Sequence, residues 1–166
     1  MDAATIREVF ERHSLRWTKQ REEVYAALHA SEAHPTADEL YHLVNGRARC
    51  DGVRAESEEV FTPISLATVY NCLEAFMKCG LCRRLASPAT TPRGDGAFRY
   101  DADMADHAHI VGADGRVIDL PDELSRKVLA CVPPSVVREV EQRLGVGIGR
   151  ISVELFETGR ANPHAQ

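Results

Sequence analysis

The sequence predicts an α+β protein of two domains, and two observations support this prediction. Apolar residues recur at helical spacing in several segments between residues 5 and 80, whereas strand-like segments predominate after residue 97. Between them, residues 86–96 (ASPATTPRGDG) are rich in proline, glycine and threonine, which is typical of a loop or hinge. We therefore expect domains at 1–86 and 97–160, a hinge at 87–96 and a disordered tail at 161–166.

Four helices are predicted in the first domain, starting at or near Thr5, Thr18, Thr36 and Ser65. The third start is marked by Thr36 with Glu39 three residues later, which is the capping-box pattern, and a helix of about ten residues should follow. The segment 45–63 is polar, contains two glycines and shows no period, so it is predicted to be a loop. Gly80 should end the fourth helix, and a short strand at 81–85 should follow.

The second domain is predicted to be a small sheet with one helix. Its strand-like pieces are AFRYD, HAHIV, RVIDL and RISVELF, and a helical pattern spans residues 134–144.

Composition limits the classes of function. The chain has no secretory signal and no apolar stretch long enough to span a membrane, so we expect a cytoplasmic protein without membrane contact. Its five cysteines are scattered, which favours reduced thiols over a disulfide framework. A net charge of −5 argues against a general nucleic-acid coat protein but allows a local basic patch. Nucleophile-elbow, cysteine-protease and phosphate-loop motifs are missing, so no enzyme is predicted.

Histidines and aspartates form the most informative cluster. His107 and His109 are two positions apart on a predicted strand, so their imidazoles should point the same way. Candidate partners are Asp101, Asp119 and His34. A mixed nitrogen and oxygen set suits Fe²⁺, Mn²⁺, Zn²⁺ or Ni²⁺ rather than Cu⁺. The alternative from the pattern alone is a solvated strand face with nearby surface acids.

The cysteines give a weaker signal. Cys79 and Cys82 have C-x-x-C spacing, which occurs in zinc half-sites and redox pairs, but the chain has no second such pair. Cys72 and Cys131 are surrounded by apolar residues and are expected to fill the core.

The predicted helix after Ser65 has the residues of a DNA-reading helix. Thr68 and Ser65 supply hydroxyls for phosphates, and Tyr70 and Asn71 supply polar groups for base edges. Arg16, before the second helix, can enter a minor groove or pair with phosphate. The alternative is a solvated helix face with Tyr70 buried.

Four strings occur in an order and spacing that resemble the ferric uptake regulator family, from about Thr5 to Phe156: RWTKQR (16–21), HPTADELY (34–41), ISLATVYNCL (64–73) and FRYD…HAH (98–109). The resemblance implies an N-terminal winged helix-turn-helix domain, a C-terminal α/β dimerisation domain, and a homodimer on a pseudo-palindromic DNA operator. It also implies one divalent metal per subunit, Fe²⁺ or Mn²⁺ first and Zn²⁺ as an alternative, held by His34, Asp101, His107, His109 and Asp119.

Two positions within the family pattern resemble its peroxide-sensing repressors, namely Asp101 and Asn71. In such repressors bound iron leads to oxidation of a ligand histidine, which here implies His34 or His107. One alternative is a regulator of iron, zinc, nickel or manganese homeostasis from the same family. A second is a metal enzyme or storage module whose N-terminal domain contacts proteins.

The chain departs from the family pattern in two ways. It lacks the paired C-x-x-C motifs of the family's structural zinc site, so no four-cysteine zinc is expected. The segment 47–61 is longer than usual, and no function is assigned to it.

Overall fold

The computed structural model describes residues 1–50, 63–85 and 97–157. The described residues divide into two compact units, with the boundary between Met104 and Ala105. The expected hinge at 87–96, the expected tail at 161–166 and most of the segment 47–61 lie outside the described residues. No helix in the described part of the chain is long and apolar enough to cross a membrane.

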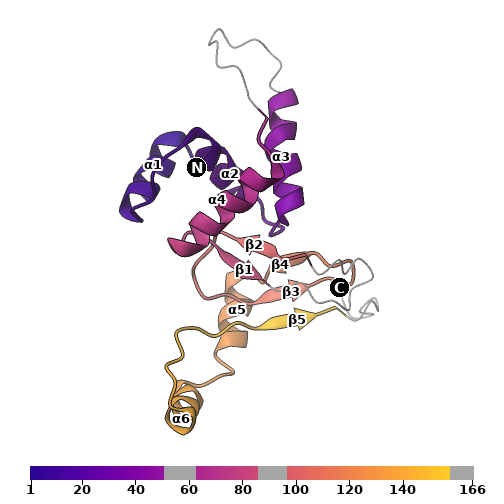
Figure 1. Cartoon of the computed structure of the whole chain (residues 1–166). Helices are drawn as coiled ribbons and strands as arrows, with labels where there is room; N and C mark the ends of the chain where they lie inside the picture. Colours follow the sequence, from indigo (N-terminus) through magenta and orange to yellow (C-terminus); the bar gives the residue numbers. More distant parts are fainter. Residues whose placement is uncertain (51–62, 86–96, 158–166) are drawn as a thin grey trace. The chain divides into compact units, whose positions relative to one another are not determined.

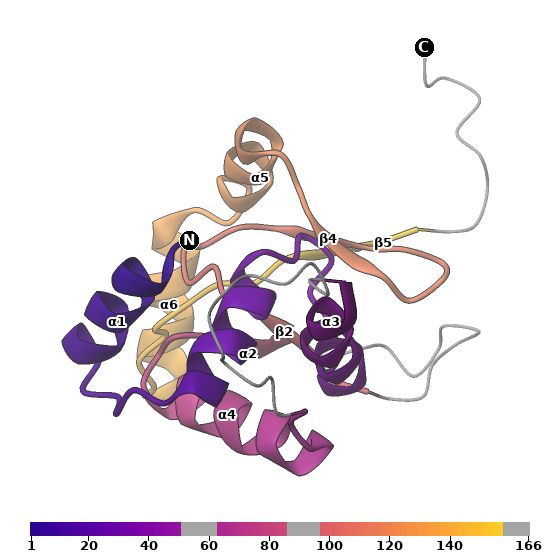
Figure 2. The same cartoon turned by 90° about the horizontal axis from the view of Figure 1, so that it is seen from above.

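Unit 1, up to Met104, begins with four helices: α1 (Ala3–Arg12), α2 (Lys19–His29), α3 (Ala37–Cys50) and α4 (Leu66–Lys78). All four start at side-chain caps, because Asp2, Thr18, Thr36 and Ser65 each accept a backbone N–H three residues later. The predicted starts at Thr18 and Ser65 are thus confirmed. Both views place α2 between α1 and α3 (Figures 1 and 2).

The capping box of α3 forms as predicted, but the helix is longer than expected. Thr36 Oγ1 accepts the Glu39 N–H at 3.1 Å, and the Thr36 N–H donates to Glu39 Oε2 at 2.8 Å. Because α3 continues to Cys50, the prediction of a loop from residue 45 was wrong for this stretch. The physical reason is Asn45, whose side-chain amide bonds both backbone groups of Ile64 and so joins α3 to the start of α4.

An aromatic cluster forms the centre of the unit 1 core. Phe10, Tyr25 and Phe76 come from α1, α2 and α4, and their ring centroids are 5.3–5.8 Å apart. Phe10 and Phe76 are completely buried. Aliphatic side chains surround the cluster, among them Ile6, Val24, Leu28, Leu40, Val69 and Leu73. This core fixes α4 against the other helices.

Two short strands complete unit 1. Gly80, at φ +69°, ends α4, and the chain enters β1 (Arg83–Leu85), which pairs antiparallel with β2 (Arg99–Asp101). Helices followed by this two-stranded ribbon form a winged helix, so the predicted N-terminal fold is confirmed.

Unit 2, from Ala105, contains a three-stranded sheet in the order β4–β3–β5. β3 (His109–Val111) pairs antiparallel with β4 (Val117–Asp119) and parallel with β5 (Glu154–Phe156). The helical pattern at 134–144 is confirmed as α6 (Pro134–Leu144). The prediction of a single helix was wrong, because α5 (Asp122–Leu129) precedes it; this helix has 8 residues and starts at Pro121 without a side-chain cap. The α+β class is confirmed.

Candidate metal centre and DNA-contact helix

His34 lies in the turn between α2 and α3 with a positive φ of +43°. This left-handed conformation is uncommon for a residue with a Cβ and needs support from its surroundings. The support comes from β2, because Arg99 Nη1 donates to the His34 carbonyl at 3.0 Å and the Tyr100 N–H donates to the Pro35 carbonyl at 3.0 Å. The second strand of the wing therefore holds the turn that carries His34.

Asp101 ends the same strand and lies beside His34. Its Oδ1 is 3.7 Å from His34 Nδ1, and both side chains are buried. Its Oδ2 accepts from Arg83 Nε at 2.6 Å, and Arg83 is also its cross-strand partner in β1. Unit 1 thus brings together two of the five predicted ligands; we call His34 and Asp101 the unit 1 pair.

The other three predicted ligands come together in unit 2, and we call His107, His109 and Asp119 the unit 2 group. Asp119 Oδ1 is 2.8 Å from His107 Nε2 and 3.4 Å from His109 Nε2, and the two imidazole centroids are 4.5 Å apart. His109 and Asp119 are register partners of β3 and β4. The premise that both histidines lie on one strand was wrong, because β3 begins at His109, yet both imidazoles approach Asp119.

Hydrogen bonds hold the backbone between the two histidines and orient the His107 imidazole. Ala108, between them, donates its N–H to Ser125 Oγ at 2.7 Å, and its carbonyl accepts the Leu120 N–H at 2.8 Å. The Nδ1–H of His107 donates to the Ala105 carbonyl at 2.9 Å. In the neutral imidazole this hydrogen bond leaves the lone pair on Nε2, the nitrogen that approaches Asp119.

The donor atoms fit a divalent metal. Two ligand atoms at about 2.1 Å from one ion and about 90–110° apart are about 3.0–3.4 Å from each other. The Asp119 contacts in the unit 2 group, at 2.8 and 3.4 Å, and the His34–Asp101 separation of 3.7 Å in the unit 1 pair lie close to that range. Imidazole nitrogens with carboxylate oxygens are the donors that Fe²⁺, Mn²⁺ and Zn²⁺ share.

The C-x-x-C pair is not arranged as a reactive pair. Cys82 is buried and its Sγ–H points to the Leu73 carbonyl at 3.9 Å; burial raises its pKa to about 12. Cys79 is half-buried at the end of α4. Cys72 fills the core as predicted, and burial raises its pKa to about 11. The same prediction for Cys131 was wrong, because it is exposed after the short helix α5.

These burial differences predict the order of thiol alkylation. In a Cys50→Ser background at pH 8, Cys131 should react with a maleimide first, whereas Cys72 and Cys82 should stay unmodified until the chain is unfolded. The thiolate is the reacting form, and the raised pKa of both buried thiols keeps them protonated well above pH 8. Peptide mass spectrometry after timed quenching measures the order. Early labelling of Cys82 in the folded protein would contradict its assigned burial.

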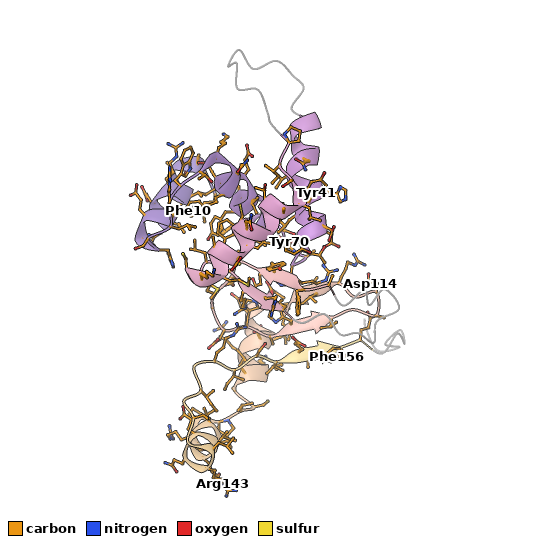
Figure 3. All side chains as sticks on the ribbon, viewed as in Figure 1. Phe10, Tyr41, Tyr70, Asp114, Arg143 and Phe156 are labelled. Atoms are coloured by element: carbon orange, nitrogen blue, oxygen red, sulfur yellow. The ribbon has the colours of Figure 1, made fainter. Side chains whose placement is uncertain are left out.

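Four of the five predicted DNA-contact residues lie at the start of α4. Ser65 Oγ caps the helix by accepting the Thr68 N–H at 3.1 Å, and the two hydroxyls are 2.9 Å apart. Tyr70 is 48% exposed (Figure 3), so the alternative of a buried tyrosine does not apply, and Asn71 is exposed as well. Arg16 is exposed, and its carbonyl accepts from Arg21 Nη1 at 2.6 Å.

Three residues that support the ligands were not recognised from the sequence. Arg83 and Arg99 are buried on strands β1 and β2. Arg83 contacts the Asp101 carboxylate, and Arg99 donates to the His34 carbonyl. The third residue is Ser125, whose hydroxyl accepts the Ala108 N–H. Period-two alternation could have identified Arg83, because it shares the inward face of β1 with Leu85.

Comparison with known proteins points to one family. The model of the ferric uptake regulator family matches residues 12–133. Over 108 residues the chain is 32% identical to the peroxide-responsive repressor PerR of Staphylococcus saprophyticus, covering 64% of this chain and 60% of that protein. Over 113 residues it is 32% identical to the peroxide operon regulator of Bacillus subtilis, covering 68% and 65%. The matches thus span less than two thirds of these relatives.

The fold is also similar to solved structures. The structure of the ferric uptake regulator from Pseudomonas aeruginosa with manganese superposes with a TM-score of 0.59 at 23% identity, covering 93% of this chain and 98% of that one. At this identity the likeness concerns the fold.

Proposed function

Because this chain belongs to the ferric uptake regulator family, we propose that it is a metal-dependent transcriptional repressor that binds operator DNA as a homodimer in the cytoplasm. The observation that carries the proposal is the division of the ligands. The unit 1 pair belongs to the winged helix, and the unit 2 group belongs to the other unit. One ion bound by both would connect the DNA-contact unit to the rest of the chain.

Chain connectivity supports one shared ion. Only residues 102–106 separate Asp101 from His107, and a chain of that length spans at most about 20 Å. The two ligand groups are therefore at high effective concentration with respect to each other. Binding by both favours one arrangement of the units, in proportion to the difference in metal affinity between that arrangement and the others. Metal removal should therefore lower DNA affinity.

The DNA-contact helix is α4, by this proposal. Its exposed Tyr70 and Asn71 would reach base edges, the hydroxyls of Ser65 and Thr68 lie at its N-terminal end, where phosphates bind, and Arg16 would contact the backbone or the minor groove. A homodimer would present two such helices to two half-sites of a pseudo-palindromic operator.

Exposed apolar side chains support the homodimer. No residue of α6 is buried, although Val136, Val140 and Leu144 follow helical spacing on it. Leu124 of α5 and Phe156 of β5 (Figure 3) are exposed as well. An apolar helix face left exposed, as on α6, usually marks a protein interface. A second copy of the chain would cover it.

The donor set favours Fe²⁺ or Mn²⁺, with Zn²⁺ as an alternative, at one ion per subunit. A four-cysteine zinc site is not part of the proposal, because the chain lacks the paired C-x-x-C motifs of that site.

The finer proposal is that the signal is peroxide. Asp101 and Asn71 support it, as do the names of the two relatives above. Iron, when bound, supplies the redox chemistry: an imidazole carbon of His34 or His107 gains one oxygen atom from hydrogen peroxide, and the second oxygen leaves as water. The modified imidazole is a poorer ligand, so the metal bridge and DNA binding are lost. A metal-homeostasis regulator is the second candidate, because the same donors bind manganese or zinc reversibly.

Mass spectrometry of the iron-loaded protein separates the candidates. A DNA site is first selected from random sequence with the Mn²⁺-loaded protein; samples loaded with Fe²⁺ or Mn²⁺ then receive stoichiometric peroxide. A peroxide sensor should gain 16 Da on His34 or His107 and lose DNA binding in the iron sample, while the manganese control stays unmodified. Unmodified histidines with DNA binding still governed by metal would establish metal homeostasis. Failure to select any DNA would favour a metal enzyme or storage module.

A further inference from the structure

Arg83 occupies an unusual position for a cation. Its side chain is buried, 6% exposed, and its Nε lies 2.6 Å from Oδ2 of Asp101, which is 2% exposed. The Arg83–Asp101 register of β1 and β2 fixes this contact through the backbone. The carboxylate that faces His34 through Oδ1 is therefore already paired with a positive charge through its other oxygen. A cation placed beside a cation-binding carboxylate must affect how strongly that carboxylate binds metal.

We propose that Arg83 is a positioning residue that sets the metal affinity of the chain; the inference rests on the proposed function. By holding Oδ2, the guanidinium restricts Asp101 to binding an ion through Oδ1 alone. Its charge also opposes a divalent cation at that oxygen, and the repulsion is weakly screened because both groups are buried. Arg83 thus keeps metal binding weaker than the donor set would otherwise allow, so that the bound fraction follows the metal supply.

Two substitutions separate charge from structure. Arg83→Gln and Arg83→Lys each keep a hydrogen-bond donor and lose the planar fork of the guanidinium, but only lysine keeps the charge. We expect Arg83→Gln to bind Mn²⁺ at least about tenfold more tightly than the wild type and Arg83→Lys to stay within about threefold. A purely structural role would weaken Mn²⁺ binding in both variants. The readout is the loss of the free Mn²⁺ electron paramagnetic resonance signal during titration, which requires no DNA.

Arg84 provides the matched control for net charge. It is the next residue of β1, is exposed, and lies with its guanidinium 3.9 Å from the Phe98 ring centroid rather than on Asp101. Arg84→Gln makes the same change in net charge and should leave the Mn²⁺ affinity unchanged. Equal tightening in Arg84→Gln would overturn the inference, because the effect would then belong to the overall charge of the chain.

Folding and metal binding are read separately. In Arg83→Gln, Asp101 would lose its charged partner, so the melting temperature of the metal-free variant should fall. Adding Mn²⁺ should then raise the melting temperature of this variant by more than it raises that of the wild type. An Arg83→Gln variant with a smaller Mn²⁺-induced rise would contradict the inference.

The Asp101→Ala variant tests the proposed function itself. If it binds Mn²⁺ as the wild type does, the metal site and this inference both fail; if it binds weakly but Arg83→Gln does not tighten, only the inference fails.

Discussion

Replacing His109 with alanine is expected to weaken Mn²⁺ binding more than about 100-fold and to remove the metal dependence of DNA binding. Changing groups that merely orient metal ligands costs about 10–100-fold, and His109 is proposed to be a ligand itself. Its imidazole is fully buried, and its Nε2 lies 3.4 Å from Asp119 Oδ1. Titration of the variant with Mn²⁺, followed by DNA binding with and without metal, measures both effects.

An exposed histidine serves as the control for this variant. His42 lies on α3, is exposed and is not one of the five proposed ligands. His42→Ala should therefore keep wild-type metal affinity. Because a buried imidazole also contributes to packing, the unfolding of metal-free His109→Ala should be recorded alongside. A variant that folds, binds Mn²⁺ normally and still represses in a metal-dependent way would remove His109 from the proposed ligand set.

Replacing Phe76 with alanine should lower the free energy of unfolding of unit 1 by about 3–5 kcal/mol, the usual cost of removing a buried aromatic ring. Phe76 contacts the rings of both Phe10 and Tyr25, so the cavity would lie at the junction of α1, α2 and α4. Because α4 carries Tyr70, DNA binding should weaken together with stability.

The single tryptophan makes this measurement specific to unit 1. Trp17 precedes α2, and its Nε1 donates to Glu22 Oε2 at 2.6 Å, so its fluorescence during urea unfolding should report the helical unit. Leu43→Ala is the control, because Leu43 is 40% exposed on α3 and its truncation should cost less than about 0.5 kcal/mol. A loss below about 1 kcal/mol for Phe76→Ala would show that the aromatic cluster is not the centre of the core.

Helices with strong local signals could be predicted from the sequence. The caps at Thr18, Thr36 and Ser65 and the stop at Gly80 are short-range patterns, and the helices begin or end there. The end of α3 could not be predicted, because Asn45 resembles a loop residue until Ile64 is known to be its partner. Helix α5 was missed because it is short, with 8 residues, and starts without a side-chain cap.

The ligand residues were recognised by type and spacing, but the groups that hold them were not. The proximity of His107, His109 and Asp119 could be predicted, because the β3–β4 hairpin that brings them together is a local structure. In contrast, Arg99 reaches a carbonyl 65 residues earlier in the chain, and Arg83 reaches Asp101 across the wing. Such contacts depend on the tertiary fold: alternation along β1 can indicate that Arg83 faces inward, but it does not identify Asp101 as its partner.

The hydrogen bonds between Asn45 and Ile64 have a consequence for how this family member tolerates insertions. They join the two ends of the intervening segment, so its closure is fixed by the helices rather than by its own sequence. For a segment closed in this way, doubling its length costs only about 0.6 kcal/mol of closure entropy. The DNA-contact unit can therefore accept extra residues there, or an inserted peptide tag, at little thermodynamic expense.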